Sequence, residues 1–420
     1  MTQDTISIDA LENAVAGGAV AIRAVTQLEP AGGPSDKIFP PTYTQDGHAT
    51  TKYATEERLV GGSKIMTVLL DSVASQANRL EEALLEGWRR QELSFPVVEV
   101  DFTGIEGLED LGAVTSLDAP HRIADAILRD SLLDGVPFRH TPIGTAFTES
   151  RPTHSTGMFQ YCPTALVFGV WDSTGPKGGL GAKFQRCLVS EIVGMDAVLG
   201  VKTASRLDPL GIQKHAGTIY EPADPAEGWT LDESEARKKK GAAVKLKKGT
   251  PAEINHSNIP PSLDHEAGGV TISHAVQTSV LSLAGLRKLR FVQDSAGEQF
   301  SSADQRSAER AARTALAALA LAAVVFQREN GFDLRSRSLL VAKEPLRFEI
   351  LPSAGGDAQE ANLDRQEAAE LLAEAGRRAA AVGLGWHVEA VKLVPAPKLA
   401  DLVLKSRELV QAGEGAEDEG

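Results

Sequence analysis

The pattern of apolar and polar positions along the chain predicts both helices and strands. Residues 63–91 carry apolar side chains at helical spacing, which predicts an opening helix with Ser63 as its N-cap. Residues 302–328 are apolar almost all round in their second half, so we expect a long helix buried in the protein. Further helical patterns predict a helix over 118–133 and a surface helix over 364–382.

Runs rich in Val, Ile, Leu and aromatic residues predict strands between these helices. They cover residues 18–28, 95–102, 164–171, 184–193, 270–283, 289–292, 339–350 and 384–393. In chain order the larger pieces read strand, helix, strand, then strand, long helix, strand. This order is typical of a ferredoxin-like sheet, the arrangement of the RNA-recognition motif. We therefore expect an α+β fold in which two helices cover one face of a sheet and the other face is free for a ligand.

Long segments without clean periodicity interrupt this order, and we expect them to be insertions. The predicted palm with its insertions covers residues 1–351, and a helix and strand are added over 352–400. Residues 401–420 end in an acidic stretch of small residues, so we expect a disordered tail. The expected insertions are a loop over 29–57, a helical insertion over 103–160 and a basic insertion over 218–266.

Composition limits the classes of protein to which the chain can belong. The 420 residues are 42% hydrophobic, enough for a sizeable core, and carry a formal net charge of −14. This charge argues against coating nucleic acid through overall charge but leaves room for a local basic groove. The two cysteines cannot form a disulfide framework or a cysteine-rich zinc site. No run of about 20 apolar residues and no signal peptide is present, so we expect a cytoplasmic protein without a membrane segment.

The sequence carries no familiar catalytic motif. There is no G-x-S-x-G elbow, no H-E-x-x-H and no C-x-x-C pair, and the nine histidines are scattered. The loop GPKGGLGAKF fits neither of the glycine-rich patterns that bind nucleotide phosphates, so it predicts a flexible loop with basic residues. We expect no metal, no cofactor and no enzymatic activity.

Four basic clusters stand out against the acidic composition. They are RKKKGAAVKLKK (237–248) with seven positive charges and no acid, GLRKLRF (285–291), LRSRSLL (334–340), and the glycine-rich loop. If residues 334–340 enter a strand, Arg335 and Arg337 point to the same side. Each cluster could be paired with nearby acids or be a solvated loop. Together they predict several separate contacts with a polyanionic strand.

Five segments resemble, in the same order, one CRISPR-associated family. They are LLDSVASQANRLE (69–81), FGVWDS (168–173), FQRCLVSEIVG (184–194), GLRKLRF and DLRSRSLLV. The family is the RAMP-type, Cas-seven-like backbone subunit of type I-G (formerly I-U) Cascade, and the resemblance spans roughly residues 17–351. It implies a modified RNA-recognition-motif palm with large finger and thumb insertions. It also implies a non-catalytic subunit that polymerises along CRISPR RNA and presents the spacer for pairing with target DNA.

The resemblance implies several partners. These are the guide RNA, other copies of the chain in a head-to-tail filament, the guide-RNA-processing subunit, the large subunit, target DNA paired with the guide, and a helicase-nuclease recruited later. Aromatic residues make up 5% of the chain, so we expect contacts to the RNA backbone and 2′-hydroxyls to dominate.

A polar stripe beside the apolar face of the opening helix consists of Ser72, Ser75, Gln76 and Arg79. It fits this role, because hydroxyls, an amide and a guanidinium can bind phosphate and ribose. The alternative is that the stripe borders a helix contact within the core. The residues expected to bind RNA are Ser72, Gln76, Asn78, Arg79, Lys177, Lys183, Arg186, Arg335, Arg337 and Arg23. Further candidates for nucleic-acid contacts are Lys238, Lys239, Lys240, Lys245, Lys247, Lys248, Arg287 and Arg290. For segment 237–248 the sequence leaves three partners open, namely RNA, target DNA and a neighbouring subunit.

Two other functions remain open. One is an RNA-cleaving backbone subunit like those of type III complexes, in which Asp46 or Asp71 would support metal-dependent cleavage. The other is a metabolic α/β enzyme, which would have a small-molecule pocket and no affinity for RNA.

Overall fold

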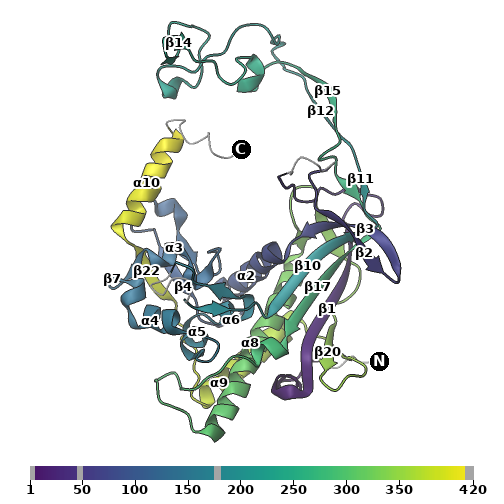
Figure 1. The fold of residues 1–420 in the computed structure, drawn as a ribbon, viewed down its shortest axis with the longest axis vertical. Coiled ribbons are helices and arrows are strands. Elements are labelled where there is room, and N and C mark those ends of the chain that lie inside the picture. The colour runs from purple at the N-terminus through teal and green to yellow at the C-terminus, as the bar shows by residue number, and fades with distance from the viewer. Residues whose placement is uncertain (1–4, 45–50, 175–180, 412–420) are drawn as a thin grey trace. The chain divides into compact units, whose positions relative to one another are not determined.

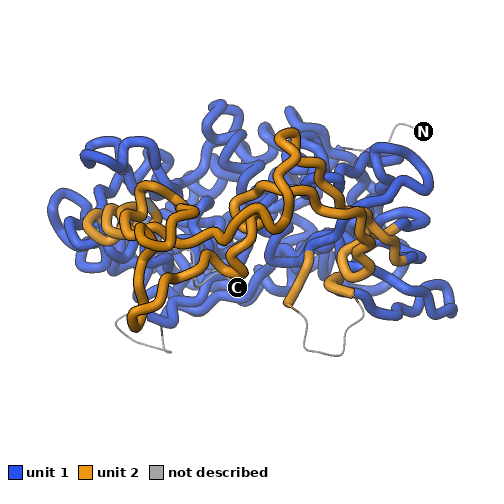
Figure 2. Tube along the Cα trace, turned by 90° about the horizontal axis from the view of Figure 1, so that it is seen from above, with its two compact units in different colours: residues 1–41, 54–198, 271–399 blue, residues 42–53, 199–270, 400–420 orange. Residues whose placement is uncertain are grey.

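The computed structural model describes residues 5–44, 51–174 and 181–411. The chain divides into two compact units, which Figure 2 colours separately. Unit 1 comprises residues 1–41, 54–198 and 271–399, and unit 2 comprises residues 42–53, 199–270 and 400–420. Each unit is described by itself below.

A large antiparallel sheet forms the centre of unit 1 (Figure 1). Its strands run in the order β18-β19-β1-β17-β10-β3-β2, and β20 pairs with both β1 and β21. Their bounds are β1 Ala19–Pro30, β2 Thr55–Val60, β3 Ser63–Asp71, β10 Leu188–Met195, β17 His274–Ser282, β18 Phe332–Asp333, β19 Leu339–Ala342, β20 Phe348–Pro352 and β21 Gln359–Ala361.

Two helices cover one face of this sheet. In β17 every second side chain, from Ala275 to Leu281, is buried against them, and the side chains between are half-exposed. Helix α2 (Val73–Arg89) and helix α8 (Ser302–Asn330) pack on this face and on each other. The second half of α8 is buried all round, as its sequence predicts, and its many alanines let neighbouring helices approach closely.

A second sheet in unit 1 joins segments far apart in the sequence. Its order is β5-β4-β22-β6-β7, and β22 runs parallel to β4. The bounds are β4 Val98–Asp101, β5 Ala113–Thr115, β6 Ser131–Leu133, β7 Val136–Pro137 and β22 Val391–Pro395. The predicted strand 95–102 therefore exists, but it belongs to this sheet and not to the large one.

Shorter elements complete the chain. The remaining helices are α1 Ile8–Asn13, α3 Ala126–Arg129, α4 Pro142–Glu149, α5 Thr156–Tyr161, α6 Pro163–Phe168, α7 Leu283–Leu286, α9 Arg365–Ala381 and α10 Pro397–Gln411. The remaining strands are β8 Val170–Trp171, β9 Lys183–Phe184, β11 Val198–Leu199, β12 Lys202–Arg206, β13 Lys238–Lys239, β14 Ala242–Ala243, β15 Ile259–Asp264 and β16 Val270–Thr271. None of the helices in the described ranges is long and apolar enough to span a bilayer.

The start of the opening helix was predicted wrongly. Residues 63–71 form strand β3, which pairs with β2 across a two-residue turn at Gly61 and Gly62. Both glycines have positive φ, 57° and 84°, as a tight hairpin turn requires. The helix begins at Val73, and the Ser72 side chain caps it by accepting from the backbone N–H of Ser75.

Other predicted elements also need correction. Residues 163–168 form helix α6 rather than a strand, because Pro163 supplies the fixed φ of a first helical turn. The predicted helix 118–133 is a series of short turns that ends in β6, and residues 289–292 form no strand. Segment 103–160, predicted to be helical, also contains strands β5 to β7. The predicted disordered tail is helical as far as Gln411, and the rest of it lies outside the described residues.

Both cysteines are buried in unit 1. Cys162 precedes α6, and its Sγ lies 3.5 Å from the Thr164 hydroxyl oxygen. Cys187 precedes β10, and burial raises the pKa of its thiol to about 11. Burial also raises the pKa of Cys162. Neither thiol is therefore positioned to act as a nucleophile.

A buried carboxylate organises one end of the large sheet. Asp71, at the end of β3, is 0% exposed. Its Oδ1 accepts a hydrogen bond from the Ser75 hydroxyl (2.6 Å), and its Oδ2 accepts from Gln76 Nε2 (2.6 Å) and Arg79 Nε (3.0 Å). The guanidinium of Arg335 lies 3.7 Å from the same carboxylate.

The network continues across the sheet through neutral side chains. The Gln76 side-chain oxygen accepts from the Ser190 hydroxyl on β10 (2.9 Å) and from Gln277 Nε2 on β17 (2.8 Å). Gln277 Nε2 also donates to the side-chain oxygen of Gln327 on α8 (2.9 Å). Two strands and two helices are therefore held in register by polar contacts inside an otherwise apolar layer.

We expect Asp71→Ala to destabilise the protein strongly, because it removes the negative charge between two guanidinium groups and the acceptor of a buried amide and a hydroxyl. The expected loss in free energy of unfolding is about 3–5 kcal/mol, measured by urea denaturation. Asp357→Ala, at an exposed position, is the control and should change the free energy by no more than about 0.5 kcal/mol. Equal effects of the two substitutions would contradict this role for Asp71.

Candidate nucleic-acid interface

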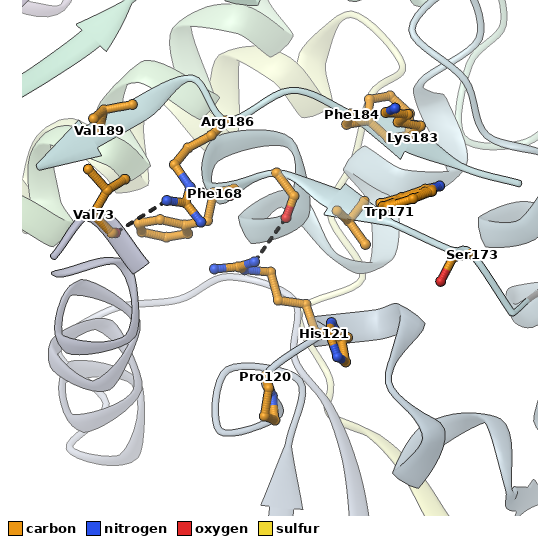
Figure 3. Close-up of a pocket in the computed structure, with 13 residues that line it drawn as sticks. Val73, Pro120, His121, Phe168, Trp171, Ser173, Lys183, Phe184, Arg186 and Val189 are labelled. Atoms are coloured by element: carbon orange, nitrogen blue, oxygen red, sulfur yellow. Dashed lines mark hydrogen bonds between the residues drawn. The ribbon is translucent and has the colours of Figure 1, made fainter. Parts of the chain in front are cut away.

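A cleft of about 660 Å³ opens in unit 1 beside the first turn of α2. Figure 3 shows its lining, which comes from the start of α2, the chain before α3, strands β8 and β9, and the start of β10. The lining residues are Val73, Pro120, His121, Arg122, Phe168, Gly169, Val170, Trp171, Ser173, Lys183, Phe184, Arg186 and Val189.

The backbone brings an aromatic ring and an ammonium group together at this cleft. Gly169, with φ of 81°, ends α6, and a Cβ there would come within 2.9 Å of the Arg186 backbone nitrogen. The chain then enters β8, which pairs with β9 so that Trp171 lies opposite Lys183. The Lys183 Nζ lies 4.9 Å from the centroid of the Trp171 ring, and Trp171 is 55% exposed (Figure 3).

Arg186 supplies a second cation on the wall of the cleft. Its Nε donates to the Phe168 carbonyl (3.0 Å) and its Nη1 donates to the Val73 carbonyl (3.2 Å), so the guanidinium spans the gap between α6 and α2 (Figure 3). Burial lowers its pKa, and the nearby Arg122 lowers it further. The buried carboxylate of Glu81 acts in the opposite direction and raises the pKa of Arg186, although the hydrogen bonds of that carboxylate go to Arg122.

A buried ion pair lies behind this wall. Arg122 donates to both carboxylate oxygens of Glu81, each at 2.6 Å, and its Nη1 donates to the Gly169 carbonyl (3.0 Å). Burial raises the pKa of Glu81 to about 7, against the opposing effect of Arg122. The pair therefore fixes the peptide at which the chain turns into β8.

The acid next to Trp171 is also turned inward. Asp172 is buried and accepts two hydrogen bonds of 2.8 Å from Arg139. As a result the described residues that line the cleft include Arg122, Lys183 and Arg186 but no Asp or Glu. Phe168 and Phe184 are buried and Arg122 is paired with Glu81, so the groups left for a ligand are the exposed Trp171 ring, Lys183 and Arg186. An exposed ring beside two cations suits a ligand with planar rings and negative charge.

The structure divides the predicted polar stripe of α2. Gln76 is 0% exposed, and both ends of its amide bind protein groups. Arg79 donates through all three nitrogens, to Asp71 and to the carbonyls of Asp333 and Leu334. In the structure, Gln76 and Arg79 therefore make contacts within the protein, which was the alternative to RNA binding. RNA binding by these two residues stays a prediction.

Two other residues of α2 and its cap that were predicted to bind RNA, Ser72 of the stripe and Asn78 beside it, differ in exposure. Ser72 is half-buried at the N-cap, one residue before Val73 of the cleft lining, and Asn78 is exposed. Of the stripe predicted as one surface, Ser75, Gln76 and Arg79 thus form an internal network around Asp71, and Ser72 lies at its margin.

Arg335 and Arg337 do not lie on one side of a strand. They belong to the turn between β18 and β19, where Arg337 has a positive φ of 61°. Arg335 donates to the Leu70 carbonyl (3.0 Å), whereas the guanidinium of Arg337 lies 4.1 Å from the centre of the Phe39 ring. The positive φ turns the two side chains in different directions, which strand periodicity could not predict.

Three further arginines have partners within the protein. Arg23 on β1 pairs with Glu349 (2.6 Å), and Arg290 pairs with Glu309 (2.9 Å). Arg287 donates to the Ala19 carbonyl (2.8 Å). Lys177 lies outside the described residues. The lysines predicted to bind nucleic acid in 237–248 are exposed and belong to unit 2.

Sequence reasoning missed several residues of the cleft. Trp171, Phe168 and His121 were not predicted to bind RNA, although FGVWDS was recognised as a motif. A tryptophan next to glycine-rich, basic sequence was the available signal for an exposed ring. The approach of Arg122 from a distant segment had no sequence signal, because it depends on the buried pairing with Glu81.

The raised pKa of Glu81 predicts a pH-dependent contribution to stability. Folded Glu81 binds its proton more tightly than an unfolded glutamate, so this contribution is present below about pH 4.5 and is lost as pH rises through about 7. Relative to Glu81→Gln, the wild-type free energy of unfolding should fall by about 1–3 kcal/mol over this range, measured by urea denaturation. Glu82→Gln, at the exposed neighbour, should follow the wild-type profile. Parallel profiles for wild type and Glu81→Gln would refute the assignment.

Comparison with known proteins gives one family match. Residues 22–199 match the model of a family described as CRISPR-associated protein GSU0053. No curated protein matches the chain. The crystal structure of Csc2 from Thermofilum pendens is similar at 13% identity and a TM-score of 0.26, with 97% of this chain and 81% of that chain covered. A TM-score this low does not establish a shared fold. The segment from residue 22 to residue 199, which contains every residue that lines the cleft, is thus similar to a CRISPR-associated family.

Proposed function

We propose that the chain is a CRISPR RNA-binding backbone subunit of a Cascade complex, and that the cleft beside α2 binds the RNA. The observation that carries this proposal is the described lining of the cleft, which combines the exposed ring of Trp171 with the cations Lys183 and Arg186 and contains no carboxylate, in a chain of net charge −14. Cations bind phosphate oxygens, and exposed rings stack on unpaired bases. The family match supports the CRISPR role because it includes the whole cleft.

The topology of unit 1 supports an RNA-recognition-motif-like palm. Strands β20, β1, β17 and β10 are neighbours in this order, with α2 and α8 on one face. Along the chain, β1, β10, β17 and β20 are the first to fourth of these strands, so their order in the sheet is 4-1-3-2. This is the strand order of a ferredoxin-like sheet. Strands β3 and β2 extend it at one edge.

The open face of this sheet is a poorer RNA site than the cleft. Strands β1, β10 and β17 contain no Phe, Tyr or Trp, and the apolar Val25 is exposed there. The charged residues around them are paired, Arg23 with Glu349 and Arg58 with Glu191. With no Phe, Tyr or Trp and no unpaired Lys or Arg on these three described strands, this face offers little to a single strand, so RNA binding through the cleft is the better proposal.

We further propose the finer assignment to type I-G, a head-to-tail filament along the guide, and contacts with the other Cascade subunits. A filament needs two different surfaces on each copy, one for each neighbour. The resemblance of five ordered sequence segments to the type I-G backbone subunit supports this assignment.

We propose a non-catalytic role in preference to an RNA-cleaving one. Asp71 is buried and accepts three hydrogen bonds, so its oxygens are unavailable to a metal ion or to RNA. Asp46 lies outside the described residues. With Mg²⁺ or Mn²⁺ present, labelled target RNA should stay intact in the assembled complex on a denaturing gel. Cleavage that Asp46→Ala abolishes would establish the alternative.

The direct test is to co-express the chain with its operon partners and a CRISPR array. We expect a multi-copy particle that contains RNA of discrete guide length, detected by size-exclusion chromatography and gel analysis of the extracted RNA. Protein of monomer size without nucleic acid would refute the proposal and favour the metabolic enzyme.

Substitutions in the cleft should weaken RNA binding by the isolated chain, measured by fluorescence anisotropy with single-stranded RNA. Trp171→Ala removes a stacking surface and should cost about 1–3 kcal/mol, or roughly 5–150-fold in affinity. Arg186→Ala removes a charged donor and should cost a similar amount. Trp229→Ala in unit 2, at a tryptophan that is also exposed, is the matched control and should have little effect. Loss of affinity with the control but not with Trp171→Ala would place the RNA elsewhere.

A further inference from the structure

The basic segment 237–248 lies in unit 2 and contributes nothing to the cleft. Strands β13 and β14 form a hairpin in which Lys240 and Gly241 are the turn, with φ of 52° and 84°. Positive φ at both central residues is typical of a type I′ turn, the tightest way to join two antiparallel strands. The tip of the hairpin therefore has a defined conformation and exposes Lys238, Lys239 and Lys240.

Backbone contacts hold this hairpin to the rest of unit 2. The Arg237 N–H donates to the Glu221 carbonyl (2.8 Å), and the Val244 N–H donates to the Arg237 carbonyl (2.9 Å). The Arg237 guanidinium also pairs with the Glu221 carboxylate, and Ala236 next to it is buried. Arg237 thus fixes the base of the hairpin, and the lysines beyond it are not needed for that purpose.

The lysines of this segment have no acidic partners within the described ranges. Lys238, Lys239, Lys240, Lys245, Lys247 and Lys248 are exposed, and none forms an ion pair with a described residue. Other lysines of unit 2 do, since Lys52 pairs with Glu266 (3.3 Å) and Lys202 with Asp264 (3.1 Å). Concentrating like charges on one rigid element is unfavourable unless an external anion relieves the repulsion.

We propose that segment 237–248 is a docking surface for the phosphate backbone of double-stranded DNA. This site is separate from the RNA-binding cleft and goes beyond the proposed function. Lysine is depleted at protein–protein interfaces, whereas its ammonium group binds phosphate as a mobile point charge. Nucleic acid is therefore the polyanion that these residues favour.

The absence of rings favours a duplex over a single strand. Single strands are usually held by bases stacked on aromatic side chains, and segment 237–248 contains no Phe, Tyr or Trp. A duplex keeps its bases stacked internally and presents about one phosphate charge per 1.7 Å of its axis. The segment also offers no Asn or Gln to read base edges, and its one arginine is paired, so binding should not depend on sequence.

The test measures binding of the full chain to a fluorescein-labelled DNA duplex of mixed sequence, by anisotropy between about 50 and 200 mM salt. The test variant is Lys238→Gln/Lys239→Gln/Lys240→Gln. The control variant, Lys64→Gln/Lys343→Gln/Lys392→Gln, removes the same charge from lysines that pair with carboxylates in unit 1. Circular dichroism checks that each variant is folded. If the test variant is not, Lys245→Gln/Lys247→Gln/Lys248→Gln replaces it.

We expect the test variant to bind the duplex at least tenfold more weakly than wild type does. Its slope of log affinity against log salt should become shallower by about 2–3, roughly one for each phosphate that the variant no longer binds. The control variant should keep the wild-type slope. Equal reductions in affinity for the two variants, or no binding of duplex by wild type, would overturn the inference.

A second probe separates this site from the cleft. Single-stranded RNA of the same length should bind Arg186→Ala weakly and the lysine variant nearly as well as wild type. If the lysine variant loses RNA affinity instead of duplex affinity, the surface serves a single strand and the inference fails. The two proposals can fail separately. If the wild-type chain binds the duplex through these lysines but co-expression yields no guide RNA, the proposed function is rejected and this inference stands.

Discussion

The architecture of unit 1 depends on one carboxylate that has no contact with solvent. Asp71 ends β3, and its oxygens bind three side chains of α2. Arg79 and Arg335, on either side of this carboxylate, also bind the carbonyls of Leu334 and Leu70. Residue 334 adjoins the β18–β19 hairpin at one edge of the sheet, whereas Leu70 is in β3, near the other edge.

In a flat sheet β19 and β3 would be about four strand spacings apart, or roughly 19 Å. Their direct connection requires the sheet and its edge hairpin to curl toward each other around α2 and α8. A charge in a core is costly unless its partners surround it, and here the partners are the elements that must converge. The network therefore couples the curvature of the sheet to the position of α2, and through Val73 to one wall of the cleft.

The sequence predicts the fold well where the periodic spacing of apolar residues is long and unambiguous. Strand β1, helix α8 and helix α9 lie close to their predicted bounds, and Asp364 with Glu367 forms a capping box at the start of α9. Residues 63–71 continue the helical spacing of the apolar residues after them, but Gly61-Gly62, a strong hairpin signal, decides for the strand. The parallel pairing of β4 with β22 could not be predicted, because it joins distant segments without a local signal.

The stripe of α2 lacks lysine and glutamate because it faces Asp71, which precedes Ser75, Gln76 and Arg79 by four, five and eight residues.

The burial of the two thiols has a practical consequence for chemical work on this protein. With the pKa of Cys187 raised to about 11, about one molecule in ten thousand carries that group as a thiolate at neutral pH. Cys162 is shielded in the same way. Oxidation in air and thiol-alkylating reagents should therefore leave these two thiols of the folded chain unmodified. A cysteine introduced at an exposed position would be the one reactive thiol, so a single dye, spin label or crosslinker can be attached at a chosen site without first removing the natural cysteines.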